Sequence, residues 1–206
     1  MKYKNYIFDL DGTLIDTEQA VLKTWQFTLK EYGYDFSIND VRVVLGVTTD
    51  IGLQKLNATV DSEFINHWQK NYEVFASDSD YFAGAKEMLL KLKSLKCQVG
   101  AVSSRSKNEY AMYFNSFDFD KIMDFVVLEE DTEKHKPDAE PLLKFIEMSK
   151  SNPTESIYIG DMPTDVLCAK NAGITAALVK WNGSNVEGSN ADLVFNSMDE
   201  VIVLAN

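Results

Sequence analysis

The sequence predicts an α/β protein, in which a three-layer core built on a parallel sheet carries an inserted, all-helical domain. Three observations lead to this prediction. The aromatic and aliphatic run from Tyr3 to Phe8 is typical of a buried strand. From Ala83 onward, short apolar strand patterns alternate with helical patterns. Between about residues 17 and 80 the pattern is helical throughout, and no strand pattern interrupts it.

The composition is that of an ordinary globular protein. The chain has 206 residues, of which 45% are apolar and 25% are charged, enough for a sizeable core and a smaller second domain. The net charge of −12 argues against a nucleic-acid surface, because phosphate backbones bind basic surfaces. It leaves room for a small phosphorylated ligand, whose site needs only a local cation or two.

Membrane segments and disulfides are not expected. No run of about 18 apolar residues occurs, so we expect no transmembrane helix and no membrane partner. The first residues lead straight into the expected strand and lack the apolar segment of a signal peptide. Cys97 and Cys168 are the only cysteines and lie far apart in sequence, which favours reduced thiols. We therefore expect a cytoplasmic protein.

The expected helical domain begins soon after the first strand. The apolar positions that share one face of a helix over 17–32 are Val21, Leu22, Trp25, Leu29 and Tyr32. Asp16 or Thr17 can cap the start of this helix, and Gly33 stands where it should stop. Further helical pieces are expected over 39–45, 50–56 and 62–75, followed by a polar hinge over 77–80.

The later part of the chain supplies the expected sheet. Strands are expected over 98–102, 122–128, 156–159, 174–179 and 192–195. Helices are expected over 85–95, 107–114, 139–150, 165–171 and 198–204. This alternation implies βαβ units with right-handed crossovers, and hence a Rossmann-like parallel sheet that also takes in the first strand. We therefore divide the chain into a core domain, 1–16 and 81–206, and a helical cap domain, 17–80.

Polar residues follow the ends of the expected strands, where the ligands of such sheets bind. The first strand ends in Asp9 and Asp11, which point to the same side of an extended chain because they are two residues apart. Gly12 allows the sharp turn that follows. After the second strand come Ser103 and Ser104, whose hydroxyl and N–H groups can bind an anion.

The third and fourth strands contribute a cation and two more carboxylates. Lys136 and Pro137 follow the third strand, and we expect Pro137 to occupy the first position of the next helix. The fourth strand ends in Asp161, and Asp165 follows four residues later on the same face of a helix start. Each motif alone is equally typical of a turn, a helix cap or a solvated lysine. Together they indicate a site.

Four carboxylates in one crevice repel one another at neutral pH, so the site needs a counter-charge. The four are Asp9, Asp11, Asp161 and Asp165. A divalent cation with oxygen ligands meets this need, and magnesium suits such ligands best. Zinc is disfavoured, because neither the cysteines nor His67 and His135 form a ligand spacing.

These residue types point to phosphoryl transfer. With magnesium between the carboxylates and a phosphate oxygen, one aspartate can attack phosphorus and form an aspartyl-phosphate. The other can protonate the leaving oxygen and later deprotonate water. Ser103 and Lys136 can hold the equatorial oxygens, where the charge of the transition state lies.

In order and spacing, these motifs resemble those of the haloacid dehalogenase superfamily of phosphohydrolases. The tail residues Leu178-Val179-Lys180-Trp181 and Ala191-Asp192 also resemble the phosphoglycolate phosphatase-like members of that family. The motifs that carry the resemblance are Asp9-Leu10-Asp11-Gly12-Thr13, Ser103, Lys136-Pro137 and Gly160-Asp161-Met162-Pro163-Thr164-Asp165. The resemblance implies that Asp9 is the nucleophile and a magnesium ligand. It implies that Asp11 is the general acid and base, and that its main-chain carbonyl binds magnesium.

The resemblance also assigns the remaining site residues. Ser103 and Lys136 would bind the phosphoryl group, helped by the Ser104 N–H. Asp161 would bind magnesium directly, and Asp165 would support that shell. The expected substrate is therefore a small phosphorylated metabolite.

Two further features concern substrate choice. The helical domain corresponds to the family's first-type cap, in which the loop Gly46-Val47-Thr48-Thr49 would dip towards the substrate. The second motif departs from the family, because Ser103, Ser104 and Arg105 stand where many relatives carry Thr-Asn-Lys. We interpret Arg105 as a solvated residue at a helix start; the alternative is a charge near the substrate.

The predicted function is magnesium-dependent hydrolysis of a phosphomonoester such as phosphoglycolate, a sugar phosphate or a nucleotide, or of pyrophosphate. Phosphosugar mutases of the β-phosphoglucomutase kind carry a cap histidine soon after the aspartate motif, where this chain has Val21. Haloacid dehalogenases lack the second aspartate, which is present here as Asp11. A catalytically silent binding domain would not need the intact set of Asp9, Asp11, Lys136 and Asp161. Monomer and homodimer both stay open.

Overall fold

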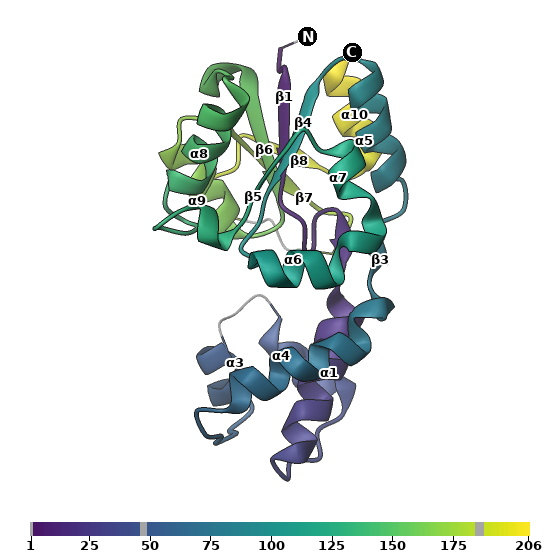
Figure 1. Cartoon of the computed structure of the whole chain (residues 1–206), viewed down its shortest axis with the longest axis vertical. Coiled ribbons are helices and arrows are strands. Elements are labelled where there is room, and N and C mark those ends of the chain that lie inside the picture. Colours follow the sequence, from purple (N-terminus) through teal and green to yellow (C-terminus); the bar gives the residue numbers. More distant parts are fainter. Residues whose placement is uncertain (1, 46–48, 184–187) are drawn as a thin grey trace. The chain divides into compact units, whose positions relative to one another are not determined.

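The computed structural model describes residues 2–45, 49–183 and 188–206 (Figure 1). The chain divides into two compact units: a core unit of Met1–Asp16 and Tyr81–Asn206, and a helical unit of Thr17–Asp80. Two short strands, β2 (Ile15–Asp16) and β3 (Asp80–Tyr81), pair where the chain passes between the units. The sequence did not predict them, because two residues are too few to form a hydrophobic pattern.

The core unit is built on a sheet of six described strands. They are β1 (Asn5–Phe8), β4 (Gln98–Val102), β5 (Phe125–Val127), β6 (Ser156–Gly160), β7 (Thr175–Val179) and β8 (Leu193–Phe195). Their order is β5-β4-β1-β6-β7-β8, and each neighbouring pair is parallel. The predicted α/β class with a parallel sheet is thus confirmed. The strand order changes direction at β1, and open α/β sheets bind their ligands at such a point.

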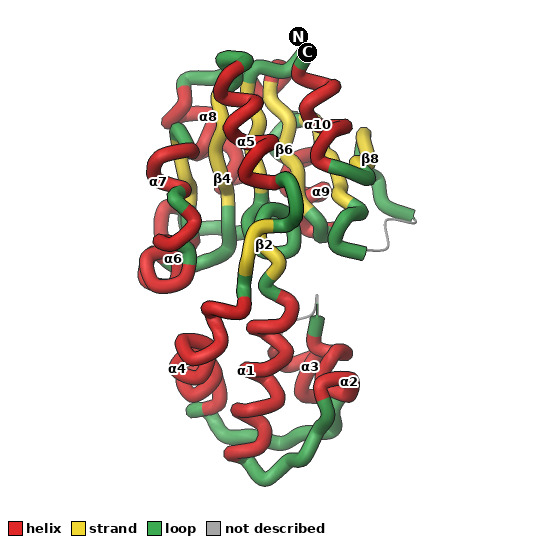
Figure 2. The backbone as a smooth tube through the Cα atoms, turned by 90° about the vertical axis from the view of Figure 1, so that its right-hand side faces the viewer, coloured by secondary structure: helices red, strands yellow, loops and turns green. Residues whose placement is uncertain are grey.

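Helices cover both faces of this sheet and make three layers (Figures 1 and 2). The helices are α5 (Ala85–Ser94), α6 (Lys107–Tyr113), α7 (Phe119–Ile122), α8 (Glu140–Ser149), α9 (Pro163–Asn171) and α10 (Met198–Ala205). α8 and α9 lie on one face, and α5 and α10 lie on the other. The packing is close: a Cβ on Gly100 of β4 would lie 2.2 Å from the ring of Phe145 on α8.

The helical unit has a small apolar core of its own. Its helices are α1 (Glu18–Glu31), α2 (Ile38–Val41), α3 (Thr49–Lys55) and α4 (Phe64–Phe75), with 3-10 turns at Arg42–Val44 and Ala76–Asp78. The buried side chains of this core are Leu22, Trp25, Leu29, Val41, Val44, Leu56 and Phe64. Trp25 of α1 and Phe64 of α4 hold the two longest helices together, with ring centroids 5.3 Å apart.

The ends of α1 are only partly as expected. Gly33 follows the last turn with a φ of +86°, which glycine adopts without strain, and so it ends the helix as predicted. Thr17 is the N-terminal capping residue, but its side chain makes no capping hydrogen bond. The stability of α1 therefore depends on its tertiary packing and not on a side-chain cap.

Two sequence predictions near the third strand are wrong. The apolar run 122–128 was expected to be one strand, but Ile122 ends α7 and β5 covers only Phe125–Val127. A short continuous apolar run does not distinguish a buried helix end from a buried strand. Pro137 lies in the loop before α8, and Pro141 occupies the first turn of that helix. Either proline could stand at the start of the helix, so composition alone could not choose between them.

Another helix begins earlier than predicted. α9 starts at Pro163 rather than at Asp165, because the Asp165 carboxylate accepts a hydrogen bond from the Met162 N–H and closes the first turn.

Among the described residues, no helix has the length and hydropathy that a membrane span requires.

Candidate active site

The loop after β1 brings the first predicted site residues to the carboxyl edge of the sheet. Asp9 follows the strand directly, and its N–H donates to the Ile159 carbonyl of β6 at 2.9 Å. The chain then turns at Gly12, whose φ is +75°. A Cβ on Gly12 would lie 2.4 Å from an Asp161 carboxylate oxygen, so only glycine lets these two loops meet.

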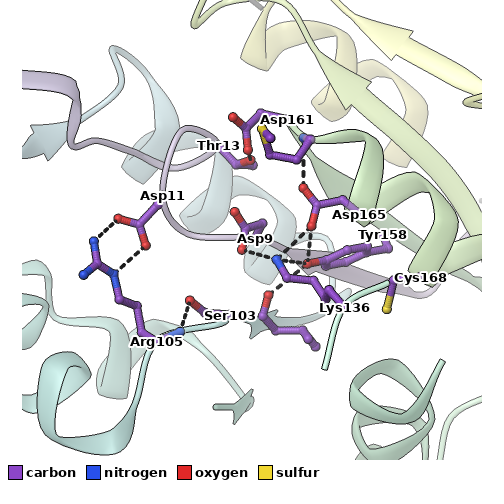
Figure 3. A network of polar contacts seen from close by, with 12 residues as sticks. Asp9, Asp11, Thr13, Ser103, Arg105, Lys136, Tyr158, Asp161, Asp165 and Cys168 are labelled. Atoms are coloured by element: carbon purple, nitrogen blue, oxygen red, sulfur yellow. Dashed lines mark hydrogen bonds and ion pairs between the residues drawn. The ribbon is translucent and has the colours of Figure 1, made fainter. Parts of the chain in front are cut away.

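Three of the predicted carboxylates converge at this edge (Figure 3). Asp9, Asp161 and Asp165 each offer one oxygen, and the three oxygens lie within 4.8 Å of one another. Asp9 is 6% exposed and Asp165 is 1% exposed. Such a largely buried set of oxygen donors suits a hard divalent cation.

Lys136 reaches into this cluster from the loop between β5 and α8. Its Nζ donates to Asp9 Oδ1 and to Asp165 Oδ1, both at 2.8 Å, and to the Tyr158 hydroxyl at 3.2 Å. Burial alone lowers the pKa of Lys136, but the carboxylates of Asp165 and Asp9 raise it well above its usual value. The lysine is therefore a fixed positive charge beside Asp9.

One lysine does not offset the charge of the whole cluster. Burial raises the pKa of Asp9 to about 7, although Lys136 lowers it in part and Asp165 raises it further. Burial likewise raises the pKa of Asp161 to about 8, with added repulsion from Asp9 and Asp165. The protein alone thus opposes full ionisation of these groups, as expected of a site that a cation completes.

The two serines line a small cavity together with Lys136. The Ser103 N–H donates to the Val127 carbonyl at 3.0 Å, and its hydroxyl accepts a hydrogen bond from the Arg105 N–H at 3.2 Å. A cavity of about 10 Å³, room for about one water molecule, is lined by Ser103, Ser104, Leu128, Glu129, Thr132, His135, Lys136 and Pro141. The structure therefore brings Ser103, Ser104 and Lys136 to one small space.

Asp11 points away from the other carboxylates (Figure 3). Its two carboxylate oxygens accept hydrogen bonds from Arg105, from Nε at 3.0 Å and from Nη2 at 2.8 Å. The Arg105 side chain is only 13% exposed, so our interpretation of it as a solvated residue is wrong. The rings of Tyr113 and Phe114 cover its guanidinium, whose carbon lies 5.9 and 5.8 Å from their centroids. No helical pattern in the sequence indicated this contact.

Sequence reasoning also missed two residues that donate hydrogen bonds to the loops carrying the site residues. Asn182 donates to the Gly12 carbonyl at 2.7 Å and to Asp161 at 3.2 Å, and the Trp181 indole N–H donates to the Thr13 carbonyl at 2.9 Å. Both follow β7, so the strand-end rule places them at the carboxyl edge of the sheet but does not show which loops they contact.

Tyr158 of β6 lies beneath the cluster. Its hydroxyl donates to the Val102 carbonyl at 2.9 Å and lies 3.3 Å from Asp165 Oδ1. Because it also contacts Lys136, it fixes the end of the lysine side chain. Within the strand pattern Tyr158 looked like an ordinary apolar position.

The expected specificity loop is only partly covered. Gly46, Val47 and Thr48 lie outside the described residues, and Thr49 is the first residue of α3.

Comparisons with known proteins agree with this arrangement. The family described as haloacid dehalogenase-like hydrolase matches residues 6–179. A protein of Caldanaerobacter subterraneus, provisionally named pyrophosphatase PpaX, is 31% identical over 88% of this chain and 84% of its own. Pyrophosphatase PpaX of Bacillus mycoides is 27% identical over 98% of this chain and 96% of its own. A solved structure from Lactobacillus plantarum, provisionally named a phosphoglycolate phosphatase, has a TM-score of 0.84 at 27% identity and covers 99% of this chain and 100% of its own.

Proposed function

Because the chain belongs to the haloacid dehalogenase-like hydrolases, as its motifs predicted, we propose that it is a magnesium-dependent phosphatase that works through an aspartyl-phosphate on Asp9. One observation carries the proposal. A buried aspartate at the end of the central strand lies beside a fixed lysine and two more carboxylates, and a second aspartate follows two residues later. This set supplies a nucleophile, a counter-charge and a proton carrier in one place.

Asp9 is the carboxylate best placed to attack phosphorus. Asp165 is held on both oxygens, by Met162 on one and by Lys136 and Tyr158 on the other. Asp161 accepts hydrogen bonds from Thr13 and Asn182. Within the described part of the chain, Asp9 accepts only through Oδ1, which leaves Oδ2 for the attack.

The reaction then takes two balanced steps. Asp9 Oδ2 bonds to phosphorus as the bond to the leaving oxygen breaks, and Asp11 gives that oxygen a proton. Water next attacks the aspartyl-phosphate, its proton passes to Asp11, and the bond between Asp9 and phosphorus breaks. Inorganic phosphate leaves, and both aspartates return to their starting state.

The magnesium ligands would be Asp9, the main-chain carbonyl of Asp11, and Asp161, with Asp165 supporting the shell. The buried oxygen donors within 4.8 Å of one another, and the raised pKa values of Asp9 and Asp161, fit such an ion. When bound, magnesium would reduce the repulsion between the carboxylates and the phosphate and polarise a phosphoryl oxygen. Ser103, the Ser104 N–H and Lys136 would hold the other phosphoryl oxygens.

The substrate proposal has two candidates. A small phosphomonoester, such as phosphoglycolate, is the first, and the name of the solved relative from Lactobacillus plantarum supports it. Pyrophosphate is the second, and the names of the PpaX relatives support it. We also propose that the helical unit is the cap and that its loop Gly46-Val47-Thr48-Thr49 helps to select the substrate.

A phosphate-release screen tests these proposals together. We expect phosphomonoesters or pyrophosphate to be hydrolysed with magnesium and not with EDTA. No release from any compound by a folded protein that binds magnesium would favour a mutase or a silent binding domain instead. The same screen run on Thr48→Ala and Thr49→Ala should give an altered substrate profile, and an unchanged profile would remove the loop from the proposal.

The raised carboxylate pKa values predict how stability depends on pH. Asp9 and Asp161 bind protons more tightly in the folded protein than in the unfolded chain, with pKa values of about 7 and about 8. The free energy of unfolding without metal should therefore be greater at pH 5 and fall by a few kcal/mol as the pH rises to 8. Urea unfolding in EDTA at both pH values measures this fall.

Magnesium supplies the control for this measurement. It should restore most of the lost stability at pH 8, where the ligands are ionised, and little at pH 5. Asp9→Asn should reduce the fall, because it removes one of the two titrating groups. A metal-free protein that is equally stable at pH 5 and pH 8 would contradict the assigned repulsion.

A further inference from the structure

The site contains a second, largely buried cation, Arg105, for which the reaction above has no use. We propose that Arg105 binds an anionic group on the leaving-group side of the substrate. The enzyme would then prefer phosphate compounds whose leaving group itself carries a phosphate or a carboxylate. This inference rests on the proposed function, because the role of Asp11 is what defines the leaving-group side.

Arg105 is held in place by the core unit. Its N–H donates to the Ser103 hydroxyl, which ties its backbone to the phosphate-binding motif. Its Nη1 lies 3.4 Å from Glu109 Oε1, and Glu109 in turn closes the first turn of α6 on Ser106. With two aromatic rings over it and only 13% exposure, the guanidinium keeps one position. A cation fixed in this way is built for a partner at a defined place.

Asp11 is one of the partners of Arg105 in the structure. The Nε and Nη2 groups form a fork on its two carboxylate oxygens, at 3.0 and 2.8 Å. A guanidinium fork fits the flat carboxylate and two oxygens of a phosphate equally well. The chemistry of the site on Arg105 is therefore that of an anion with paired oxygens.

The contact with Asp11 has to open during turnover. In the proposed reaction, Asp11 places one of its oxygens on the leaving group, and it cannot keep both oxygens on Arg105 at the same time. The Nε and Nη2 donors that Asp11 releases can then bind a pair of oxygens on the leaving group. An anionic leaving group offers such oxygens, whereas a neutral leaving group does not.

The two cations of the site serve different ends of the substrate. Figure 3 shows Asp9 with Lys136 on one side and with Asp11 and Arg105 on the other. Lys136 is bonded to the nucleophile and Arg105 is bonded to the aspartate that acts on the leaving oxygen. In the proposed reaction, Lys136 thus faces the transferred phosphoryl group, and Arg105 faces the leaving group.

The test compares leaving groups in matched variants. Pyrophosphate and phosphoglycolate have anionic leaving groups. 2-Hydroxyethyl phosphate is of similar size, but its leaving group is neutral. Arg105→Gln should lower the ratio of kcat/KM for either anionic substrate to that for the neutral one by about 10- to 100-fold, mainly through KM. Arg105→Lys, which keeps the charge without the fork, should give an intermediate ratio.

A neighbouring lysine provides the control. Lys107 is two residues away, exposed, and paired with Asp131. Lys107→Gln should leave the ratio at its wild-type value. Thermal unfolding of each variant verifies that it is folded.

Each outcome decides the proposal. If Arg105→Gln lowers the ratio of kcat/KM for pyrophosphate alone, the proposal holds and the anion that Arg105 binds is a phosphate. If it lowers the ratio for phosphoglycolate alone, the proposal holds and the anion is a carboxylate. Equal losses for anionic and neutral substrates, or a wild-type enzyme without preference, would overturn it and leave Arg105 as a residue that only positions Asp11. Magnesium-dependent release from 2-hydroxyethyl phosphate by the wild type tests the phosphatase itself, so the two proposals fail separately.

Discussion

Asp9→Asn should lower kcat by at least about 10⁴-fold for any phosphate compound that the wild type hydrolyses. The amide cannot form the aspartyl-phosphate, and the substitution replaces one of the two Asp9 carboxylate oxygens with an NH2 group. Asparagine has nearly the same size and shape as aspartate, so the loss of kcat would come from chemistry and not from packing. Single-turnover and steady-state phosphate release with magnesium measure it.

The same variant should keep its stability, which separates catalysis from folding. The pKa of Asp9, raised to about 7 by burial, shows that the folded protein opposes this charge. Removing it at pH 8 without metal should therefore not lower the free energy of unfolding and should raise it by a few kcal/mol. Asp199→Asn, in the exposed first turn of α10, is the matched control and should retain full turnover. Residual turnover above about 1% of wild type in Asp9→Asn would exclude Asp9 as the nucleophile.

Lys136→Met should damage both activity and stability. Methionine approximates the length of the lysine but leaves Asp9 and Asp165 buried without their counter-charge. Breaking a buried pair on one side costs about 3–5 kcal/mol, which we expect to lose from the free energy of unfolding at pH 8 without metal. Loss of the fixed cation should also lower kcat by about 10³-fold or more.

The pH dependence of this loss identifies its cause. At pH 5 the Asp9 carboxyl holds its proton, because its pKa is about 7 in the folded protein. Less charge is then left unpaired, and the difference between Lys136→Met and wild type should shrink. Lys144→Met, on the exposed side of α8 beside Glu147, should cost no more than about 0.5 kcal/mol at either pH. A loss that is equal at pH 5 and pH 8 would point to packing instead of charge.

Most of the fold could be predicted from the sequence because buried strands have a strong hydrophobic pattern. Gln98–Val102 was expected over the same residues that β4 covers. The pattern failed at Ile122, where an apolar run joins a helix end to a strand, and at β2 and β3, which are two residues long. Boundaries set by capping, such as the start of α9 at Pro163, depend on one side-chain hydrogen bond that periodicity does not record.

The candidate site was predictable in part for a related reason. Asp9, Asp161 and Asp165 come together because the strand ends of a parallel sheet share one edge. Which way a loop side chain points does not follow from that rule. Asp11 therefore turned out to face Arg105, and Asn182 proved to hold the Asp161 loop, although neither contact could be inferred from spacing.

The central place of β1 has a consequence for the order in which the protein can mature on the ribosome. Its neighbours β4 and β6 lie about 90 and 150 residues later in the chain. When the nascent chain has reached Asp80, the helical unit can already bury its own apolar core, while β1 still has neither partner. Asp9 is thus among the first residues synthesised and among the last to acquire its surroundings. A chain interrupted before Asp165 carries Asp9, the proposed nucleophile, without the complete candidate site.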